Sequence, residues 1–303
     1  MEFAIEAKGL TREFDGIAAV NDLNLTVEKG EIFGIVGPDG AGKTTLMRLL
    51  TAVLSPTKGT AKVASFDILK DDEKIKERIG YMPQGGLLYE EMTVEENIDF
   101  FAEVHLVKES VREERKEMLL EFSRLAPFRK RLAMNLSGGM KKKLSLSCSL
   151  IHTPEVLFLD EPTTGVDPVS RREFWRILYS LGGITIFINT PYMDEAERCG
   201  KVGLIYEGAI KLVGSPENIK SYFRKELLEI KCAPLRNAKR VLMVSPGVLG
   251  VDIFGNTLHV ILENVERDKS GIMENLKKKN IEVSGARRIF PSLEDAFVSL
   301  IKS

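Results

Sequence analysis

Residues Gly37–Thr44 read Gly-Pro-Asp-Gly-Ala-Gly-Lys-Thr, and this stretch decides the fold. It fits the pattern G-x-x-x-x-G-K-[ST] and lies between an apolar run, Glu31–Val36, and a segment with helical spacing of leucines, Thr44–Leu54. A strand, a glycine-rich loop and a helix in this order form a phosphate cradle, because backbone N–H groups at a helix N-terminus face the anion. Lys43 adds a positive charge for the phosphate oxygens, and the Thr44 hydroxyl is a ligand for Mg²⁺. The sequence therefore predicts a nucleotide-phosphate site.

A second apolar run, Val156–Asp160, ends in two acids. Asp160 at the strand end can hold Mg²⁺ through water, and Glu161 is placed to orient or deprotonate an attacking water. Alone, such a run is more typical of an ordinary strand that leaves the core, but its position after the phosphate loop favours the catalytic interpretation. Together with Ile184–Asn189, also apolar and followed by a helical pattern, it indicates buried parallel strands and an α/β core.

The regions outside these apolar runs show other patterns of secondary structure. Alternating residues before Gly30, with Asp15-Gly16 as a turn signal, predict an antiparallel sheet, and residues 90–150 predict a helical insert. The end of the chain shows the order β-α-β-β-α-β, which resembles a ferredoxin-like unit. We therefore expect a large α/β domain over residues 1–225 and a small α+β domain over residues 226–303.

Composition excludes several classes of protein. The chain has 303 residues, 44% hydrophobic and 29% charged, which is typical of a globular protein and not of a disordered tail or coiled coil. No apolar run approaches the roughly 20 residues that span a bilayer, and the start lacks a signal-peptide pattern, so we expect a cytoplasmic chain. Cys148, Cys199 and Cys232 lack metal-ligand spacing, which predicts reduced, buried thiols. A net charge of −1 gives no general attraction to nucleic acid.

The stretch Leu136–Met140 reads Leu-Ser-Gly-Gly-Met and lies between the helical insert and the acidic strand. With the two motifs above, it makes the chain resemble the ATP-binding cassette (ABC) proteins, whose signature is Leu-Ser-Gly-Gly. The resemblance covers about residues 3–225. It implies a P-loop NTPase core with an antiparallel β subdomain and a helical subdomain, and ATP and Mg²⁺ as cofactors.

The resemblance also implies roles for single residues. Phe14 matches the aromatic that stacks on adenine, Gln84 matches the glutamine that links Mg²⁺ to the partner interface, and Asp167 lies in the dimer-contact loop. Each has an ordinary interpretation as well: a half-buried strand aromatic, a polar loop residue and a turn former. The implied catalytic residues are Glu161, Lys43 and Gln84, and the implied metal ligands are Thr44, Gln84 and Asp160. The implied nucleotide-binding residues are Phe14, Gly37, Pro38, Asp39, Gly40, Ala41, Gly42, Lys43, Thr44, Thr45, Ser137, Gly138, Gly139 and Asp167.

The signature implies an assembly of two cassettes. In the family, Ser137 and Gly139 of one cassette contact the γ-phosphate that Lys43 of the other cassette holds. One chain then does not complete its own site. We expect a pair of identical cassettes, with a pair of different cassettes as the alternative, closed by ATP and reopened by hydrolysis.

Some positions depart from the family pattern. Asp39 stands where Asn is common, and Met140 replaces the usual Gln; we expect small effects from both. For Lys141–Lys143, a solvated helix face is favoured over a basic edge near ATP. Pro191 replaces a His that contacts the γ-phosphate, with Thr190 as the expected N-cap of the next helix. We expect hydrolysis to survive but to slow; the alternative is a degenerate cassette that only binds ATP.

Within the family, the runs Met-Asp-Glu-Ala-Glu at 193–197 and Pro-Ser-Leu-Glu-Asp-Ala-Phe at 291–297 resemble bacterial efflux cassettes. The resemblance implies an ATPase that powers a separate membrane-spanning permease, exports drugs or other hydrophobic compounds, and lies on the inner face of the cell membrane through that partner. The partner's helix would dock beside Gln84, with Tyr89 and Met92 as anchors or, equally, as ordinary core residues. The alternative class is a soluble cassette ATPase that acts on the ribosome or nucleic acid, with the small domain as reader.

Overall fold

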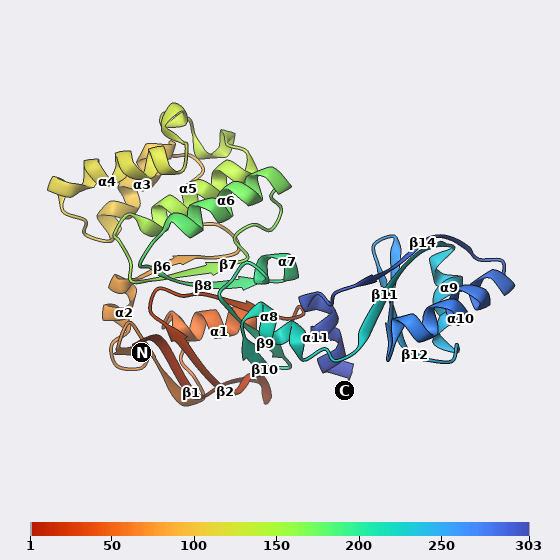
Figure 1. The fold of residues 1–303 in the computed structure, drawn as a ribbon. Helices are drawn as coiled ribbons and strands as arrows, with labels where there is room; N and C mark the ends of the chain where they lie inside the picture. The colour runs from red at the N-terminus through yellow and green to blue at the C-terminus, as the bar shows by residue number, and fades with distance from the viewer. Residues whose placement is uncertain (1, 303) are drawn as a thin grey trace. The chain divides into compact units, whose positions relative to one another are not determined.

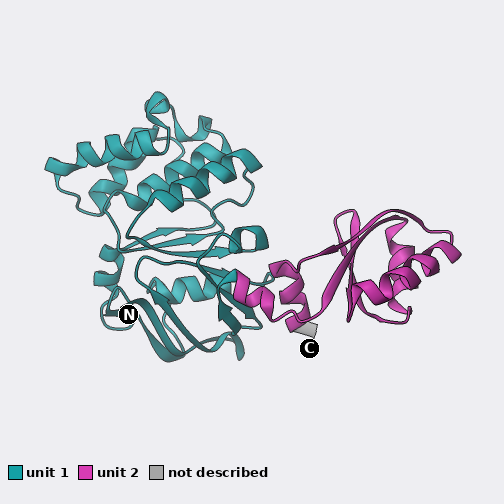
Figure 2. Cartoon of the chain, in the orientation of Figure 1, with its two compact units in different colours: residues 1–216 teal, residues 217–303 magenta. Residues whose placement is uncertain are grey.

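The computed structural model describes the backbone of residues 2–302 and the side chains of residues 2–300. The chain forms two units, which meet in sequence at Pro216 and Glu217 (Figure 2). This division lies N-terminal to the boundary expected at residue 225, because helix α8 (Pro216–Ser221) belongs with the later residues.

A six-stranded sheet forms the centre of the first unit (Figure 1). Its strand order is β10-β9-β3-β8-β7-β6, and all neighbours are parallel except β9 and β10. Because the strands are parallel, their carboxyl ends meet at one edge, where Asp160 is in register with Asn189. This confirms the predicted α/β core. The strands are β3 (Ile32–Val36), β6 (Ile79–Met82), β7 (Val156–Asp160), β8 (Thr185–Thr190), β9 (Lys201–Tyr206) and β10 (Ala209–Gly214).

An antiparallel sheet of order β2-β1-β4-β5 forms a second layer, as predicted. Helix α1 (Lys43–Leu50) lies between the two sheets, and one apolar core joins all three. The helix ends before the predicted Leu54, since the Thr51 hydroxyl donates to the Met47 carbonyl and Ala52 adopts a left-handed φ of 54°. The strands are β1 (Phe3–Phe14), β2 (Ile17–Glu28), β4 (Lys58–Val63) and β5 (Phe66–Asp67).

Helices cover the other face of the central sheet (Figure 1). The predicted helical insert is confirmed, and its first helix begins with a capping box in which Thr93 and Glu96 satisfy each other's backbone N–H groups. Two short 3₁₀ turns, η1 (Ala126–Phe128) and η2 (Ala133–Asn135), lead into the signature. The helices of the unit are α2 (Asp72–Arg78), α3 (Val94–Val104), α4 (Glu109–Phe122), α5 (Gly138–Leu150), α6 (Pro168–Ser180) and α7 (Met193–Ala196).

The second unit contains the predicted β-α-β-β-α-β order. Its antiparallel sheet has the order β12-β13-β11-β14, which is the strand order of a ferredoxin-like unit and confirms the resemblance. Helices α9 and α10 bury their apolar sides against one face of the sheet. The elements are β11 (Glu226–Ala233), α9 (Leu235–Met243), β12 (Val248–Phe254), β13 (Thr257–Leu262), α10 (Val265–Lys278), β14 (Glu282–Ile289) and α11 (Leu293–Lys302).

Two further predictions concern thiols and helix lengths. Cys148, Cys199 and Cys232 are free and buried, and burial raises the pKa of each thiol, so all three are poor nucleophiles. None of the helices in the described part of the chain has the length and apolar character needed to cross a membrane.

A pair of stacked histidines joins the end of α3 to the end of α5. The rings of His105 and His152 lie 3.8 Å apart and nearly parallel, and His152 Nε2 is 2.8 Å from the Ile79 carbonyl oxygen. Burial lowers the pKa of both side chains, that of His152 to about 4. Both rings are therefore neutral at physiological pH, which suits a stack that two positive charges would separate.

We expect this stack to make the first unit sensitive to acid. A histidine whose pKa is lower in the folded chain takes up its proton more readily when unfolded, so its stabilisation is complete above the unfolded value, near 6.5. As the pH falls from 6.5 to 4, the free energy of unfolding should fall by about 2–3 kcal/mol. Thermal unfolding between pH 7.5 and 4.5 measures this loss. His152→Gln should flatten the pH dependence, and an unchanged slope in that variant would contradict the assignment.

Candidate functional site

The phosphate loop occupies the carboxyl edge of the central sheet, between β3 and α1. Lys43 Nζ donates to the carbonyl oxygens of Gly37 and Pro38, at 2.8 and 2.9 Å. Gly42 has a φ of 98°, and a Cβ at this position would lie 2.0 Å from the Ala19 carbonyl oxygen, so no other residue fits. The loop therefore curls tightly around an open cavity of about 190 Å³, which is lined by Ala19, Asp39, Gly40, Gly42, Lys43, Thr44, Thr45 and Glu161.

The two acids after β7 lie beside this loop. Asp160 is 1% exposed, and burial raises the pKa of its carboxyl group. Its carboxylate accepts a hydrogen bond from the Asn189 amide. The Thr44 hydroxyl lies near this carboxylate and favours its charged form, which partly offsets the effect of burial on the pKa. Carboxylate and hydroxyl oxygens are ligands that Mg²⁺ prefers. The Asn189 Oδ1 atom has no hydrogen-bond partner among the described residues, which leaves a further acceptor beside Asp160. The residues therefore fit this metal.

Glu161 lines the phosphate cavity in a strained conformation. Its φ is 48°, in the left-handed region, and its N–H donates to the Asn189 carbonyl oxygen at 2.8 Å. The Thr164 hydroxyl donates to the carboxylate at 3.1 Å. These bonds hold the Glu161 carboxylate, which lines the cavity together with Lys43 and Thr44. Asp160 precedes Glu161 in the chain and acts on Lys43 through its charge, so the structure brings these four predicted residues together.

Negative charges around Lys43 partly offset the effect of burial on the pKa of its ammonium group. Burial lowers the pKa of Lys43, whereas Asp39, Glu161 and Asp160 raise it. Asp39 is exposed and lines the same cavity. This acid, which departs from the family pattern, therefore helps to keep the lysine charged.

The signature residues lie apart from the phosphate cavity. Ser137 caps α5 by accepting the Met140 N–H at 3.3 Å, and Asp167 caps α6 by accepting two N–H groups at 3.0 Å each. A Cβ on Gly139 would lie 2.6 Å from Ser170, so this glycine permits the two helix starts to approach. Within one chain these residues therefore have structural roles, and none of them lines the cavity of Lys43.

Two predicted nucleotide contacts also lie outside that cavity. Phe14 is 43% exposed at the tip of the β1–β2 hairpin, and the guanidinium of Arg12 covers its ring at 4.6 Å. Gln84 lines a different cavity of about 300 Å³, together with Gly138, Lys142 and Thr164. The roles of both residues therefore stay predictions.

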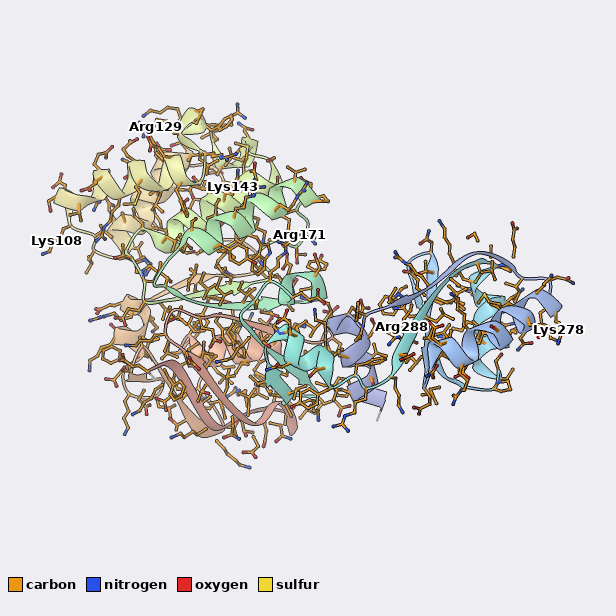
Figure 3. The ribbon with its side chains drawn as sticks, viewed as in Figure 1. Lys108, Arg129, Lys143, Arg171, Lys278 and Arg288 are labelled. Carbon is orange, nitrogen blue, oxygen red and sulfur yellow. The ribbon has the colours of Figure 1, made fainter. Side chains whose placement is uncertain are left out.

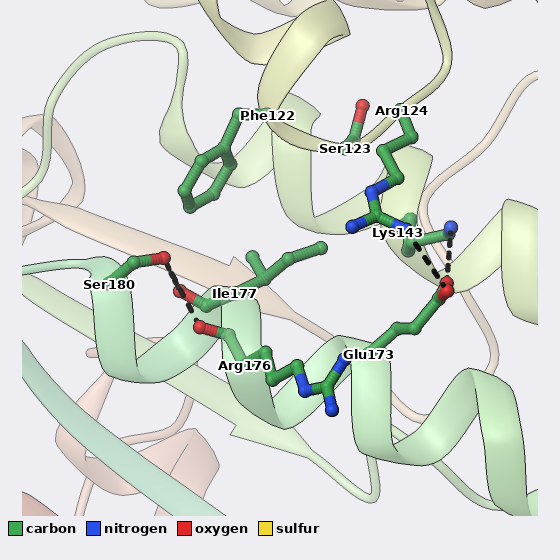
Figure 4. Close-up of a pocket in the computed structure, with 8 residues that line it drawn as sticks. All are labelled: Phe122, Ser123, Arg124, Lys143, Glu173, Arg176, Ile177 and Ser180. Carbon is green, nitrogen blue, oxygen red and sulfur yellow. Dashed lines mark hydrogen bonds and ion pairs between the residues drawn. The ribbon is translucent and has the colours of Figure 1, made fainter.

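The sequence predicted a solvated helix face for the three lysines after the signature, and this prediction is wrong, because all three are partly or fully buried. Lys143 on α5 (Figure 3) is 8% exposed. Its ammonium pairs with Glu173 at 3.1 Å (Figure 4). Arg124 pairs with the same carboxylate, beside a pocket of about 150 Å³ between α4 and α6 (Figure 4). Lys142 is half-buried and points toward Gln84. The prediction failed because these side chains meet acids and carbonyls from other elements.

The segment with Pro191 is held by a buried carboxylate. Glu195 is 0% exposed and accepts hydrogen bonds from the hydroxyls of Thr163 and Thr190, the latter at 2.7 Å. Arg171, labelled in Figure 3, pairs with it at 3.6 Å. The predicted N-cap is wrong, because helix α7 begins after Tyr192. The Thr190 hydroxyl accepts the Tyr192 N–H at 3.1 Å, in the turn before the helix, and donates its proton to Glu195.

Asn189, Thr163 and Glu195 were missed by the sequence analysis. A signal existed for Asn189, because parallel strands with adjacent carboxyl ends place Asn189 beside Asp160. No comparable signal existed for Glu195, since its partners come from α6, from the segment after β7 and from the end of β8.

The chain is similar in sequence to known ATP-binding proteins of transporters. Residues 20–164 match the family described as ABC transporter, and residues 214–301 match the C-terminal domain of DrrA1-3-like ATP-binding proteins. The chain is 40% identical, over 98% of its length and 52% of the relative, to the probable multidrug ABC transporter ATP-binding protein YbhF of Escherichia coli strain K12. It therefore spans about half of that relative. It is 31% identical to the daunorubicin/doxorubicin resistance ATP-binding protein DrrA of Streptomyces peucetius, over 98% of this chain and 92% of the relative.

Solved structures of ABC transporter subunits share the fold of this chain. An ATP-binding subunit of an ABC transporter matches with a TM-score of 0.67 and 26% identity, over 73% of this chain and 93% of that chain. CbiO1 from Clostridium perfringens, part of the ABC transporter complex cbiONQ, matches with a TM-score of 0.67 and 28% identity, over 73% and 92% of the two chains.

We expect Glu195→Ala to destabilise the first unit. It would leave two buried hydroxyls and the Arg171 side chain without their acceptor, at a cost of about 2–4 kcal/mol. Thermal unfolding measures the loss. Asp194→Ala is the matched control, because that neighbouring acid is exposed and should shift the midpoint little. Equal shifts in the two variants would refute the role given to Glu195.

Proposed function

The chain belongs to the ATP-binding proteins of the ABC transporter family, and on that premise we propose that it binds and hydrolyses ATP to power a separate membrane-spanning exporter. The observation that carries the proposal is the convergence of Lys43, Thr44 and Glu161 on one cavity, with Asp160 next to Glu161 at the end of β7. This set contains a phosphate-binding cation, oxygen ligands for a metal and a general base.

Each residue has a defined part in hydrolysis. The loop N–H groups and Lys43, once it leaves the carbonyls of Gly37 and Pro38, bind the phosphate oxygens. Thr44 and Asp160 would hold Mg²⁺, which would supply positive charge to the phosphates when bound. Glu161 orients the attacking water and takes its proton, and the Thr164 hydroxyl holds the carboxylate in place.

A pair of cassettes is part of the proposal. Its support is the separation, within one chain, of the signature residues from the cavity of Lys43. A Cβ on Gly138 would meet no atom closer than 3.8 Å, which leaves room at the signature for a ligand held by the other cassette. Two chains facing each other would thus complete two sites. An identical partner is the simpler assembly.

The membrane partner would dock on the loop after Gln84. Asn97 is fully buried and shapes this loop by bonding both the N–H and the carbonyl of Tyr89, at 2.9 and 3.0 Å. Tyr89 is 47% exposed and its ring lies against Phe100, with 4.5 Å between centroids. An exposed aromatic on a rigid loop suits a partner helix. Because DrrA and YbhF are named for drug resistance and multidrug transport, the proposed cargo is a drug or another hydrophobic compound.

We expect Glu161→Gln to abolish turnover and to spare ATP binding. The substitution keeps the side-chain shape but removes the general base, which should lower kcat by about 100-fold or more. Phosphate release and binding of a fluorescent ATP analogue measure the two effects. Residual turnover near the wild-type rate would refute the assignment.

We expect Pro191→His to raise turnover several-fold, because the new imidazole can donate a hydrogen bond to the γ-phosphate that proline lacks. Steady-state hydrolysis at saturating Mg-ATP measures the change, with Glu161→Gln as the background. A wild-type chain that binds ATP without turnover, and that Pro191→His restores, would instead identify a degenerate cassette.

A further inference from the structure

Lys142 differs from the lysines on either side of it. Lys141 pairs with Glu90 at 2.6 Å, and Lys143 pairs with Glu173 at 3.1 Å. Lys142 lies between them on α5 and has no carboxylate within ion-pair distance among the described side chains. Its side chain is nevertheless half-buried, so an interaction other than an ion pair must hold the ammonium in place.

Lys142 contacts the Gln84 loop. Its Nζ atom lies 3.5 Å from the Gln84 carbonyl oxygen, and both residues line the cavity of about 300 Å³ with Ser145 and Thr164. Thr164 in turn donates its hydroxyl to Glu161. The ammonium therefore contacts the Gln84 loop, and it shares a cavity with Thr164, the residue that bonds the Glu161 carboxylate.

The carboxylates act on this ammonium through space. Burial lowers the pKa of Lys142, while the charges of Glu161 and Asp160 raise it. Asp160 is buried, so its field is weakly screened by water. A metal ion at Asp160 would neutralise part of this field and so weaken the attraction for Lys142. The lysine and the metal thus respond to the same two negative charges.

We infer that Lys142 is a positioning residue: it ties the Gln84 loop to the signature helix α5 and is attracted to Asp160 and Glu161 until a metal ion neutralises them. The inference rests on the proposed function, because it concerns the same metal and catalytic site. It predicts a result that loss of helix stability would not produce, namely tighter metal binding after the lysine charge is removed.

The test compares Lys142→Met, Lys142→Arg and Lys141→Met in the full chain. Binding of the fluorescent analogue MANT-ATP is followed while Mg²⁺ is titrated, and hydrolysis is measured at saturating Mg²⁺. Lys142→Met should lower the Mg²⁺ midpoint about three- to ten-fold, because a repelling charge is lost, and should lower kcat about five-fold, because the Gln84 loop loses its tie. Lys142→Arg should keep the wild-type midpoint. Lys141→Met removes the same charge one residue away and should also keep it, since Glu90 already neutralises Lys141.

The outcomes separate the inference from the proposed function. An unchanged or raised Mg²⁺ midpoint in Lys142→Met would overturn the inference, and the same lowering in Lys141→Met would overturn it as a general charge effect. A wild-type chain without turnover, in which Lys142→Met still lowers the midpoint, would refute hydrolysis and support the inference. A wild-type chain without Mg²⁺-dependent nucleotide binding would overturn both.

Discussion

The meeting of parallel strand ends at one sheet edge is the constraint on which the site depends. Strands β3, β7 and β8 each contribute residues at or just past their carboxyl ends: the phosphate loop, the acids Asp160 and Glu161, and the Asn189–Pro191 segment. Parallel pairing in fixed register places these residues next to one another, although they lie far apart in sequence. A one-residue slip would turn Asp160 to the opposite face of the sheet.

Close backbone approach at this edge limits which residues are permitted. Gly42 adopts a conformation reserved for glycine against the Ala19 carbonyl, and Gly139 lets the starts of α5 and α6 meet. The strained backbone of Glu161 is held by a hydrogen bond to Asn189. Strain of this kind persists only where the surroundings determine the conformation, and here it directs a carboxylate into the phosphate cavity.

The buried polar groups around the site form a connected set. Glu195 joins the segment after β7 to the segment after β8, and Asn189 joins Asp160 to the backbone of Glu161. Such groups are stable only when their hydrogen bonds are satisfied, so they couple the two segments. Proline at position 191 does not loosen the segment after β8, because Glu195 holds Thr190 through a side-chain hydrogen bond that does not involve residue 191.

Sequence patterns were sufficient to predict the α/β architecture and to identify Lys43, Thr44 and Glu161, which the structure places on one cavity. Gly37–Thr44, Asp160 with Glu161 and Leu136–Met140 are local motifs whose chemistry depends on neighbours in the chain, and the ferredoxin-like order followed from alternating patterns. The environment of Lys141–Lys143, the partners of Glu195 and the start of α7 became known only from the three-dimensional structure. Those features depend on contacts between residues far apart in sequence, and hydrophobic periodicity contains no information about which acid or carbonyl a buried cation will meet.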